Sequence, residues 1–259
     1  MALAGEVGLH GEHDGWGPRV VLLHGFGQTC RCWGPVAPVL VDAGHEVVRL
    51  DAPGHGGSTA VAADLPATAR LVAEAGGPAV YVGYSMGARM ALHVATETPG
   101  AVRALVLVGG TPGIADRAER AERREQDAAL AERIRARGVD WFVDWWLGRP
   151  MFAGLPPGAR FEDERRRNTA DGLATSLELA GTGSQAPLWE VLAAIDAPVL
   201  ALAGEEDGRY AAVADRTAAA IGDNATLRLV AGAGHSAHLE QPERFLELLL
   251  PWLSATCGG

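Results

Sequence analysis

The chain has 259 residues and an acidic balance, with 32 carboxylates against 22 basic residues, all of them arginine. Its net charge of −10 argues against a nucleic acid as partner, and no apolar run reaches the roughly 18 residues of a membrane span. The start shows no secretory leader, and three cysteines form no disulfide framework. We therefore expect a cytoplasmic protein that binds neither membranes nor nucleic acids.

The first predicted element is a buried strand at residues 20–23, which runs into His24-Gly25-Phe26-Gly27. A His-Gly-x-Gly loop in this place is typical of an oxyanion hole, to which the loop gives one backbone N–H and the residue after a nucleophile gives another. We predict Phe26 and Met86 as these donors. We interpret His24 as a structural residue that packs under the loop and hydrogen-bonds the backbone.

A second loop, residues 49–58, follows another predicted strand, and there Asp51 and His55 are also interpreted as structural. Cys30-Arg31-Cys32 lies close by, but it is not a usual metal spacing, and no second ligand pair accompanies it.

The pentapeptide Gly83-Tyr84-Ser85-Met86-Gly87 is the most informative motif of the chain. It lies between a predicted strand at residues 79–82 and a predicted helix at residues 88–95. This context favours a nucleophile elbow, in which a serine on a sharp turn is flanked by glycines because a Cβ there would clash. We predict Ser85 as the reactive hydroxyl.

The regular alternation of strands and helices breaks between the strand at residues 102–108 and the next core strand at residues 198–202. A long charged helix is predicted at residues 116–137, and four aromatic residues follow at helical spacing. We interpret residues 112–187 as a helical cap, inserted into a core made of residues 1–111 and 188–259. Trp145 belongs either to the interior of this cap or to the wall of a substrate site.

Arginines concentrate in the cap, which holds 12 of the 22, together with 13 carboxylates. Solvated pairs between residues four apart account for most of them. Arginines that face inward over a serine would bind carboxylates bidentately, which predicts a small anionic substrate. Arg89 lies one helical turn after Ser85, so it is expected to bind either a substrate carboxylate or an acid of the cap.

A serine hydroxyl needs an imidazole to take its proton and a carboxylate to orient that imidazole. Both follow predicted strands, in the order that this elbow uses: Asp207 after residues 199–204, and His235 after residues 227–230. We predict Asp207 and His235 as these partners of Ser85. Glu205 and Glu206 are adjacent rivals for the acid, and a second histidine, His238, is expected to cap a helix or line a wall.

These elements together resemble the α/β-hydrolase superfamily over nearly the whole chain. The fold class is therefore expected to be α/β, with a mostly parallel central sheet flanked by helices. A narrower resemblance is to the 2-succinyl-6-hydroxy-2,4-cyclohexadiene-1-carboxylate synthases of menaquinone biosynthesis. It rests on the loop and elbow motifs and, in the cap, on Glu122-Arg123 with Asp127, on residues 142–145 and 150–152, and on Gly181-Thr182-Gly183-Ser184-Gln185-Ala186-Pro187.

The narrower resemblance implies a lyase that eliminates pyruvate from a cyclohexene polycarboxylate and needs neither a metal nor an organic cofactor. Ser85 would then act as a general base rather than as an acylating nucleophile. Substrate binding would fall to Tyr84, Arg89, Arg123, Trp145 and one arginine of Arg165, Arg166 and Arg167, with Arg165 favoured. The alternatives are a serine esterase, a C–C-bond hydrolase or a catalytically silent receptor. The sequence predicts no oligomeric state.

Overall fold

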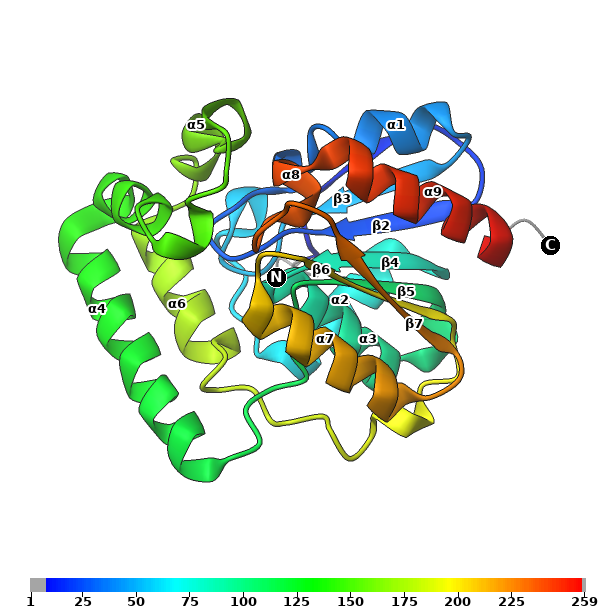
Figure 1. Cartoon of the computed structure of the whole chain (residues 1–259). Helices are drawn as coiled ribbons and strands as arrows, with labels where there is room; N and C mark the ends of the chain where they lie inside the picture. The colour runs from blue at the N-terminus through cyan, green and yellow to red at the C-terminus, as the bar shows by residue number, and fades with distance from the viewer. Residues whose placement is uncertain (1–7, 258–259) are drawn as a thin grey trace, which may run out of the picture.

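A computed structural model describes residues 8–257, which contain one sheet of seven strands in the order β1-β3-β2-β4-β5-β6-β7 (Figure 1). Only β1 runs antiparallel, paired with β3, and the other neighbours are parallel. The mostly parallel sheet agrees with the prediction, although the edge strand β1 was not foreseen. The strands are β1 (Gly11–Asp14), β2 (Arg19–Leu23), β3 (Glu46–Leu50), β4 (Ala79–Tyr84), β5 (Val102–Val108), β6 (Val199–Gly204) and β7 (Ala225–Val230).

Helices cover both faces of the sheet (Figure 1). One face carries α1 (Ala37–Asp42), α8 (Ala237–Glu240) and α9 (Pro242–Cys257), and the other carries α2 (Leu65–Gly76), α3 (Met86–Glu97) and α7 (Gly208–Ile221). Each face has its own apolar core. The central strands β4 and β6 are buried along their whole length, as expected for parallel strands that pack on both sides.

The candidate catalytic residues lie in the loops that follow the central strands. Parallel strands end at the same edge of a sheet, and the loops beyond their carboxyl ends form the usual site of open α/β folds. Here β4 leads to Ser85, β6 leads to Asp207, and β7 leads into the loop that carries His235. Three segments far apart in sequence thus meet at one edge.

Three helices stand beside this edge: α4 (Arg117–Leu147), α5 (Glu162–Arg165) and α6 (Ala170–Ala180) (Figure 1). They have an apolar core of their own, which includes Ile134, Phe142 and Leu173. The sequence predicted a helix over residues 116–137 and helical spacing after it. The structure joins both into α4, with a kink at Gly138, where φ is 84° and ψ is 172°.

None of the helices described between residues 8 and 257 combines the length and the apolar character that crossing a bilayer requires.

His93 is a buried titratable residue on α3, in the core beneath Arg89. Neither ring nitrogen has a hydrogen-bond partner among the described residues. Burial lowers the pKa of His93 to about 4, the positive charge of Arg89 lowers it as well, and the carboxylate of Asp64 opposes them. His93 is therefore neutral in the folded protein, whereas an unfolded histidine titrates near pH 6.5.

Replacing His93 by Leu should make the stability of the protein less dependent on pH. The folded pKa lies below the unfolded one, so the wild type loses stability as pH falls from about 6.5 towards 4, because the unfolded chain binds the extra proton. This residue alone accounts for a loss of about 2 kcal/mol by pH 5. Denaturant unfolding at pH 7.5 and pH 5 measures the difference. The exposed His13→Leu is the control, and an equal pH dependence in wild type and His93→Leu would contradict this account.

Candidate active site

Ser85 lies in the turn between β4 and α3, with φ 52° and ψ −106°. Such a backbone conformation is strained for any residue with a Cβ and costs of order 1–3 kcal/mol. The turn is held by the Ser85 N–H, which donates to the Val108 carbonyl over 2.8 Å. The side chain of Ser85 is thereby lifted above the end of the sheet.

The two glycines of the elbow allow β4, α3 and β2 to come into contact. A Cβ on Gly83 would clash with the Gly87 carbonyl oxygen, and a Cβ on Gly87 would clash with the carbonyl oxygen of Leu23. The G-x-S-x-G pattern is thus explained by backbone-to-backbone packing, as the sequence predicted.

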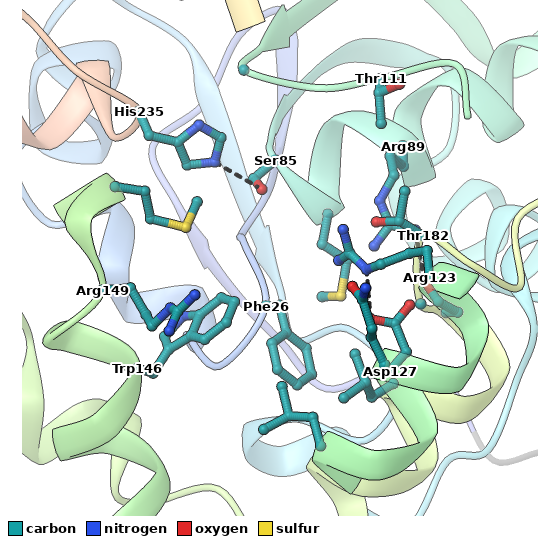
Figure 2. Close-up of a pocket in the computed structure, with 18 of the residues that line it drawn as sticks. Phe26, Ser85, Arg89, Thr111, Arg123, Asp127, Trp146, Arg149, Thr182 and His235 are labelled. Carbon is teal, nitrogen blue, oxygen red and sulfur yellow. Dashed lines mark hydrogen bonds and ion pairs between the residues drawn. The ribbon is translucent and has the colours of Figure 1, made fainter. Parts of the chain in front are cut away.

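Ser85, His235 and Asp207 form one chain of hydrogen bonds. Figure 2 shows the contact between Ser85 and His235. His235 Nε2 lies 3.2 Å from Ser85 Oγ, and His235 Nδ1 lies 2.7 Å from Asp207 Oδ2. Asp207 is also the N-cap of α7, where its Oδ1 accepts the Tyr210 N–H. Burial raises the pKa of the Asp207 carboxyl, but hydrogen bonding and charge interaction with His235 outweigh burial, and the net pKa is lowered. Asp207 therefore stays ionised and holds the imidazole with Nδ1 protonated and Nε2 facing the serine.

Glu240 holds the loop that carries His235, a role that no sequence motif indicated. Its two carboxylate oxygens accept the backbone N–H groups on either side of the histidine, Gly234 at 2.7 Å and Ser236 at 2.9 Å. The ring of Tyr210 packs against the imidazole with centroids 4.5 Å apart. The orientation of His235 is therefore set by its loop and its neighbours as well as by Asp207.

Phe26 and Met86, the predicted oxyanion donors, both line the cavity that contains Ser85. Met86 is the first residue of α3, and first-turn N–H groups have no acceptor inside their own helix. The Phe26 N–H has no acceptor among the residues that the structure describes. The N–H groups next to it are both bonded, Gly25 to Gln28 Oε1 and Gly27 to His55 Nε2.

His24, His55 and Asp51 hold this loop from below, in agreement with their structural interpretation. His24 Nε2 accepts the Ala52 N–H at 3.0 Å, and its Nδ1 lies 2.8 Å from the Gly25 carbonyl oxygen. His55 bridges the Gly27 N–H and the Pro53 carbonyl. Burial lowers the pKa of both histidines, in His55 to about 3, so each stays neutral and can accept a backbone N–H through Nε2.

One other cluster brings together groups that could ligate a metal: His10, Cys30 and Asp51, whose ligand atoms lie within 4.8 Å of one another. Asp51 already accepts hydrogen bonds from His10 Nδ1 and from the Cys30 and Gly57 N–H groups. The cluster borders a different cavity from the one at Ser85. We assign it no part in the chemistry at Ser85.

A cavity of about 630 Å³ opens at Ser85, between the sheet edge and α4 and α6 (Figure 2). Its wall is basic although the chain is acidic, with two carboxylates, Asp127 and Asp207, against the arginines Arg89, Arg123, Arg133, Arg149 and Arg209. Asp207 is engaged by His235. Four of these arginines, all but Arg123, form no ion pair with a carboxylate of the described residues.

Arg89 is a buried cation whose hydrogen bonds within the described residues go to neutral oxygens. Its Nη1 donates to the Ala180 carbonyl at 2.6 Å and lies 3.5 Å from Gln185 Oε1. Burial lowers the pKa of Arg89 to about 10, which leaves it charged at neutral pH. The ion pair with a cap acid that the sequence left open is not formed among the described residues. An unpaired guanidinium on a cavity wall is suited to bind an anion.

Arg123 and Trp145 also line the cavity, as predicted. Arg123 Nε donates to Asp127 Oδ1 over 2.7 Å, and Asp127 in turn accepts the Gly183 N–H. This links α4 to the Gly-Thr-Gly segment after α6. Trp145 stacks on Trp141 with centroids 5.6 Å apart, so it contributes both to the interior of the cap and to the cavity wall.

Arg165, Arg166 and Arg167 are consecutive residues at the end of α5, and their side chains point in different directions. Arg165 is 1% exposed and lines a small cavity next to Ser85 and His235. Its guanidinium donates to the Arg160 carbonyl and, over 3.4 Å, to the Gly27 carbonyl. Arg166 pairs with Asp140 and Asp144, and Arg167 with Glu164, on the outside. Arg165 is the one that faces the site.

Tyr84 lies beneath the reacting groups, outside the main cavity. Its hydroxyl bonds Ser236 Oγ at 2.8 Å, and its ring packs on His235 and His238. Tyr84 borders the small cavity beside Arg165.

The rivals for the triad lie elsewhere. Glu205 and Glu206 are exposed, and Glu205 accepts the Gly232 N–H. His238 is buried between Trp33 and Tyr84, and burial lowers its pKa to about 3. None of the three is in hydrogen-bonding contact with Ser85 among the described residues.

Comparison with known proteins agrees with the fold. The model of the alpha/beta hydrolase family matches residues 20–248. The chain is 34% identical to a putative 2-succinyl-6-hydroxy-2,4-cyclohexadiene-1-carboxylate synthase of Bacillus subtilis, over 91% of this chain and 90% of that protein. It is also 34% identical to the synthase of that name from Salmonella heidelberg, over 93% of this chain and 97% of that protein.

Among solved structures, MenH from S. aureus superimposes with a TM-score of 0.88 at 28% identity, covering 96% of this chain and 99% of that one. A thermophilic esterase from Thermogutta terrifontis has a TM-score of 0.84 at 24% identity, covering 96% and 93%, which shows a shared fold. The chain belongs to the α/β-hydrolase family, and it resembles the cyclohexadiene-carboxylate synthases over most of its length.

Replacing Ser85 by Gly should give a more stable protein than replacing it by Ala, by about 1 kcal/mol. Both changes remove the hydroxyl, but only glycine adopts φ 52° without strain. Denaturant unfolding of the two variants measures the difference. If both unfold at the same denaturant concentration, the elbow stores no backbone strain.

Proposed function

We propose that this member of the α/β-hydrolase family is a lyase of menaquinone biosynthesis, which eliminates pyruvate from a succinyl-enolpyruvyl-cyclohexene polycarboxylate. The proposal joins two lines of support. The relatives at 34% identity carry the synthase name, and the chain and those relatives cover each other almost completely. The cavity, in turn, has the charge that such a substrate needs.

The observation that carries the proposal is the excess of unpaired arginine around Ser85. Arg89 is held by a main-chain carbonyl and an amide rather than by a carboxylate, and Arg209 lines the same cavity without an acidic partner among the described residues. Of the two, Arg89 is buried and Arg209 is exposed. Burial of Arg89 costs desolvation energy, which an anionic ligand offsets and a neutral ester does not.

The small cavity beside Ser85 is a second place for an anionic or polar group. It is bordered by Arg165, and two further donors on its wall, Gln28 Nε2 and Trp146 Nε1, are buried without an acceptor among the described residues. With Arg89 on the other side of Ser85, the site offers cationic contacts at two ends of a ligand. A substrate with several carboxylates fits this division.

In the proposed mechanism Ser85 acts as a base. Ser85 Oγ passes its proton to His235 Nε2 and takes a proton from a ring carbon of the substrate, while Asp207 stabilises the imidazolium. The electron pair of the broken C–H bond moves onto the adjacent carbonyl or carboxylate oxygen, which accepts hydrogen bonds from the Phe26 and Met86 N–H groups.

The electron pair then returns to form a new ring double bond, and the C–O bond to the enolpyruvyl group breaks. Enolpyruvate leaves and takes up a proton to become pyruvate, and the proton on His235 returns to solvent or product. The ring proton and the leaving group account for all atoms lost by the substrate. No step calls for a metal or an organic cofactor. The two buried free thiols Cys30 and Cys32 agree with the reducing, cytoplasmic location that we propose with this function.

The purified protein should release pyruvate from the succinyl-enolpyruvyl-cyclohexene substrate, and Ser85→Ala should lower this rate to the background of the uncatalysed reaction. Loss of the hydroxyl removes the base while the fold remains. Pyruvate is measured directly, and the melting temperature of the variant is the control. Turnover of p-nitrophenyl acetate without any pyruvate release would instead identify a serine esterase.

Arg89→Met should raise KM for the polycarboxylate by roughly 10- to 100-fold, because a charge-assisted hydrogen bond to a carboxylate is lost. Arg103→Met is the matched control, since Arg103 is an exposed arginine on β5 away from the cavity. Steady-state kinetics of pyruvate release measure both. An unchanged KM in Arg89→Met would exclude Arg89 from substrate binding.

A further inference from the structure

Five residues at four-residue intervals form a stripe along α4 and just beyond it, which we call the outer stripe: Arg133, Arg137, Trp141, Trp145 and Arg149. The kink at Gly138 separates Arg133 and Arg137 from the three later residues, so four-residue spacing defines a shared helix face only on each side of the kink. Contacts between guanidinium groups and indole rings join the two parts. The guanidinium groups lie over the indole rings, Arg133 at 4.9 Å from Trp141 and 5.2 Å from Trp145. Arg137 lies 4.7 Å from Trp141, and Arg149 lies 5.1 Å from Trp145.

The outer stripe lacks acidic partners although acids are abundant around it. None of its three arginines forms an ion pair with a carboxylate in the part of the chain that the structure describes. Arg135, on the same helix, pairs with Asp171 and Glu178. The acids that lie nearest in sequence to the tryptophans, Asp140 and Asp144, are both taken by Arg166. The positive charge of the stripe is therefore not compensated.

The stripe joins the catalytic cavity to the surface. Arg133, Trp145 and Arg149 line the cavity that contains Ser85, whereas Arg137 and Trp141 lie outside it. Figure 2 shows Arg149 at the cavity wall across from Arg89 and Arg123. An anion bound to the outer residues would thus lie next to the entrance, and from there it could pass to Arg133 and then to the inner arginines.

Stacking on indole leaves the chemistry of these arginines intact. A guanidinium close to the face of an indole ring is attracted by the ring and keeps its N–H donors, because the ring offers no charged acceptor. Those edges match the two oxygens of a carboxylate. The tryptophans therefore fix the arginines without neutralising them, which an aspartate or glutamate would do.

We propose that the outer stripe is a carboxylate-binding site at the mouth of the cavity, which captures the polyanionic substrate before it reaches Ser85. This inference rests on the proposed function for the identity of the substrate. Clustered positive charge at an entrance raises the local concentration of an anion and its rate of association, and salt weakens the effect. The effect matters here because the chain as a whole carries a net charge of −10 and repels anions elsewhere.

The test uses Arg137→Gln, because Arg137 lies outside the cavity. Its kcat/KM for pyruvate release at low ionic strength should fall by about threefold, with kcat unchanged and with a weaker dependence of kcat/KM on salt. Arg135→Gln is the matched control: it removes the same charge from the same helix, but from a residue that faces Glu178 and Asp171. Wild-type values of kcat/KM at every salt concentration in Arg137→Gln would overturn the proposal.

A binding measurement separates this inference from the proposed function. Citrate, a tricarboxylate, is titrated into the protein while tryptophan fluorescence is recorded, since two tryptophans belong to the stripe. The wild type and Arg135→Gln should bind with equal affinity, and Arg137→Gln should bind more weakly. If this pattern appears but no pyruvate is released, the carboxylate-binding role of the outer stripe is supported and the proposed lyase function is wrong. If pyruvate is released but citrate binds all three proteins equally, the lyase function is supported and the carboxylate-binding role of the outer stripe is wrong.

Discussion

The contact between three backbones at the elbow is the constraint on which the site depends. The carbonyl oxygen of Leu23 lies where a Cβ of Gly87 would be, so β2 and α3 meet without a side chain between them. That approach brings the loop after β2, with Phe26, next to the first turn of α3, with Met86. It also forces the chain through a tight turn in which Ser85 adopts φ 52°. The same backbone contact therefore positions both Ser85 and the two residues that we propose as oxyanion donors.

Charge is distributed so that the acidic character of the chain stays on the outside. Acids of the cap pair with arginines on its surface, as Glu178 does with Arg135 and Asp144 does with Arg166. Toward Ser85 the balance is reversed, and Arg89 is held by uncharged oxygens. A ligand with several negative charges completes the pairing that the protein leaves open. In the proposed function, selectivity for an anionic substrate comes from the scarcity of acids in the cavity wall as much as from its arginines.

The fold and the triad could be predicted because each catalytic residue follows a strand that is recognisable from its own short apolar segment. The geometry of parallel sheets then relates these segments to one another. Ser85, Asp207 and His235 each follow an apolar strand, and parallel strands end together, so sequence order alone placed them at one edge. Orientation within the cap could not be predicted in this way. Arg165, Arg166 and Arg167 are successive residues whose directions depend on how α5 lies on the loop at Gly27. Glu240 was missed because a carboxylate that binds backbone N–H groups leaves no motif.

One glycine is shared between the core and the cap. The Gly27 N–H is bound by His55 from the core, while its carbonyl accepts hydrogen bonds from Arg165 and Asn168 of the cap. Phe26 beside it packs on Phe142 and Trp146 of α4. The loop after β2 therefore connects the core to the cap and also carries one of the proposed oxyanion donors. A substitution in the cap that removes the hydrogen bonds of Arg165 and Asn168 to this loop would therefore also disturb the position of Phe26, far from the substituted residue in sequence.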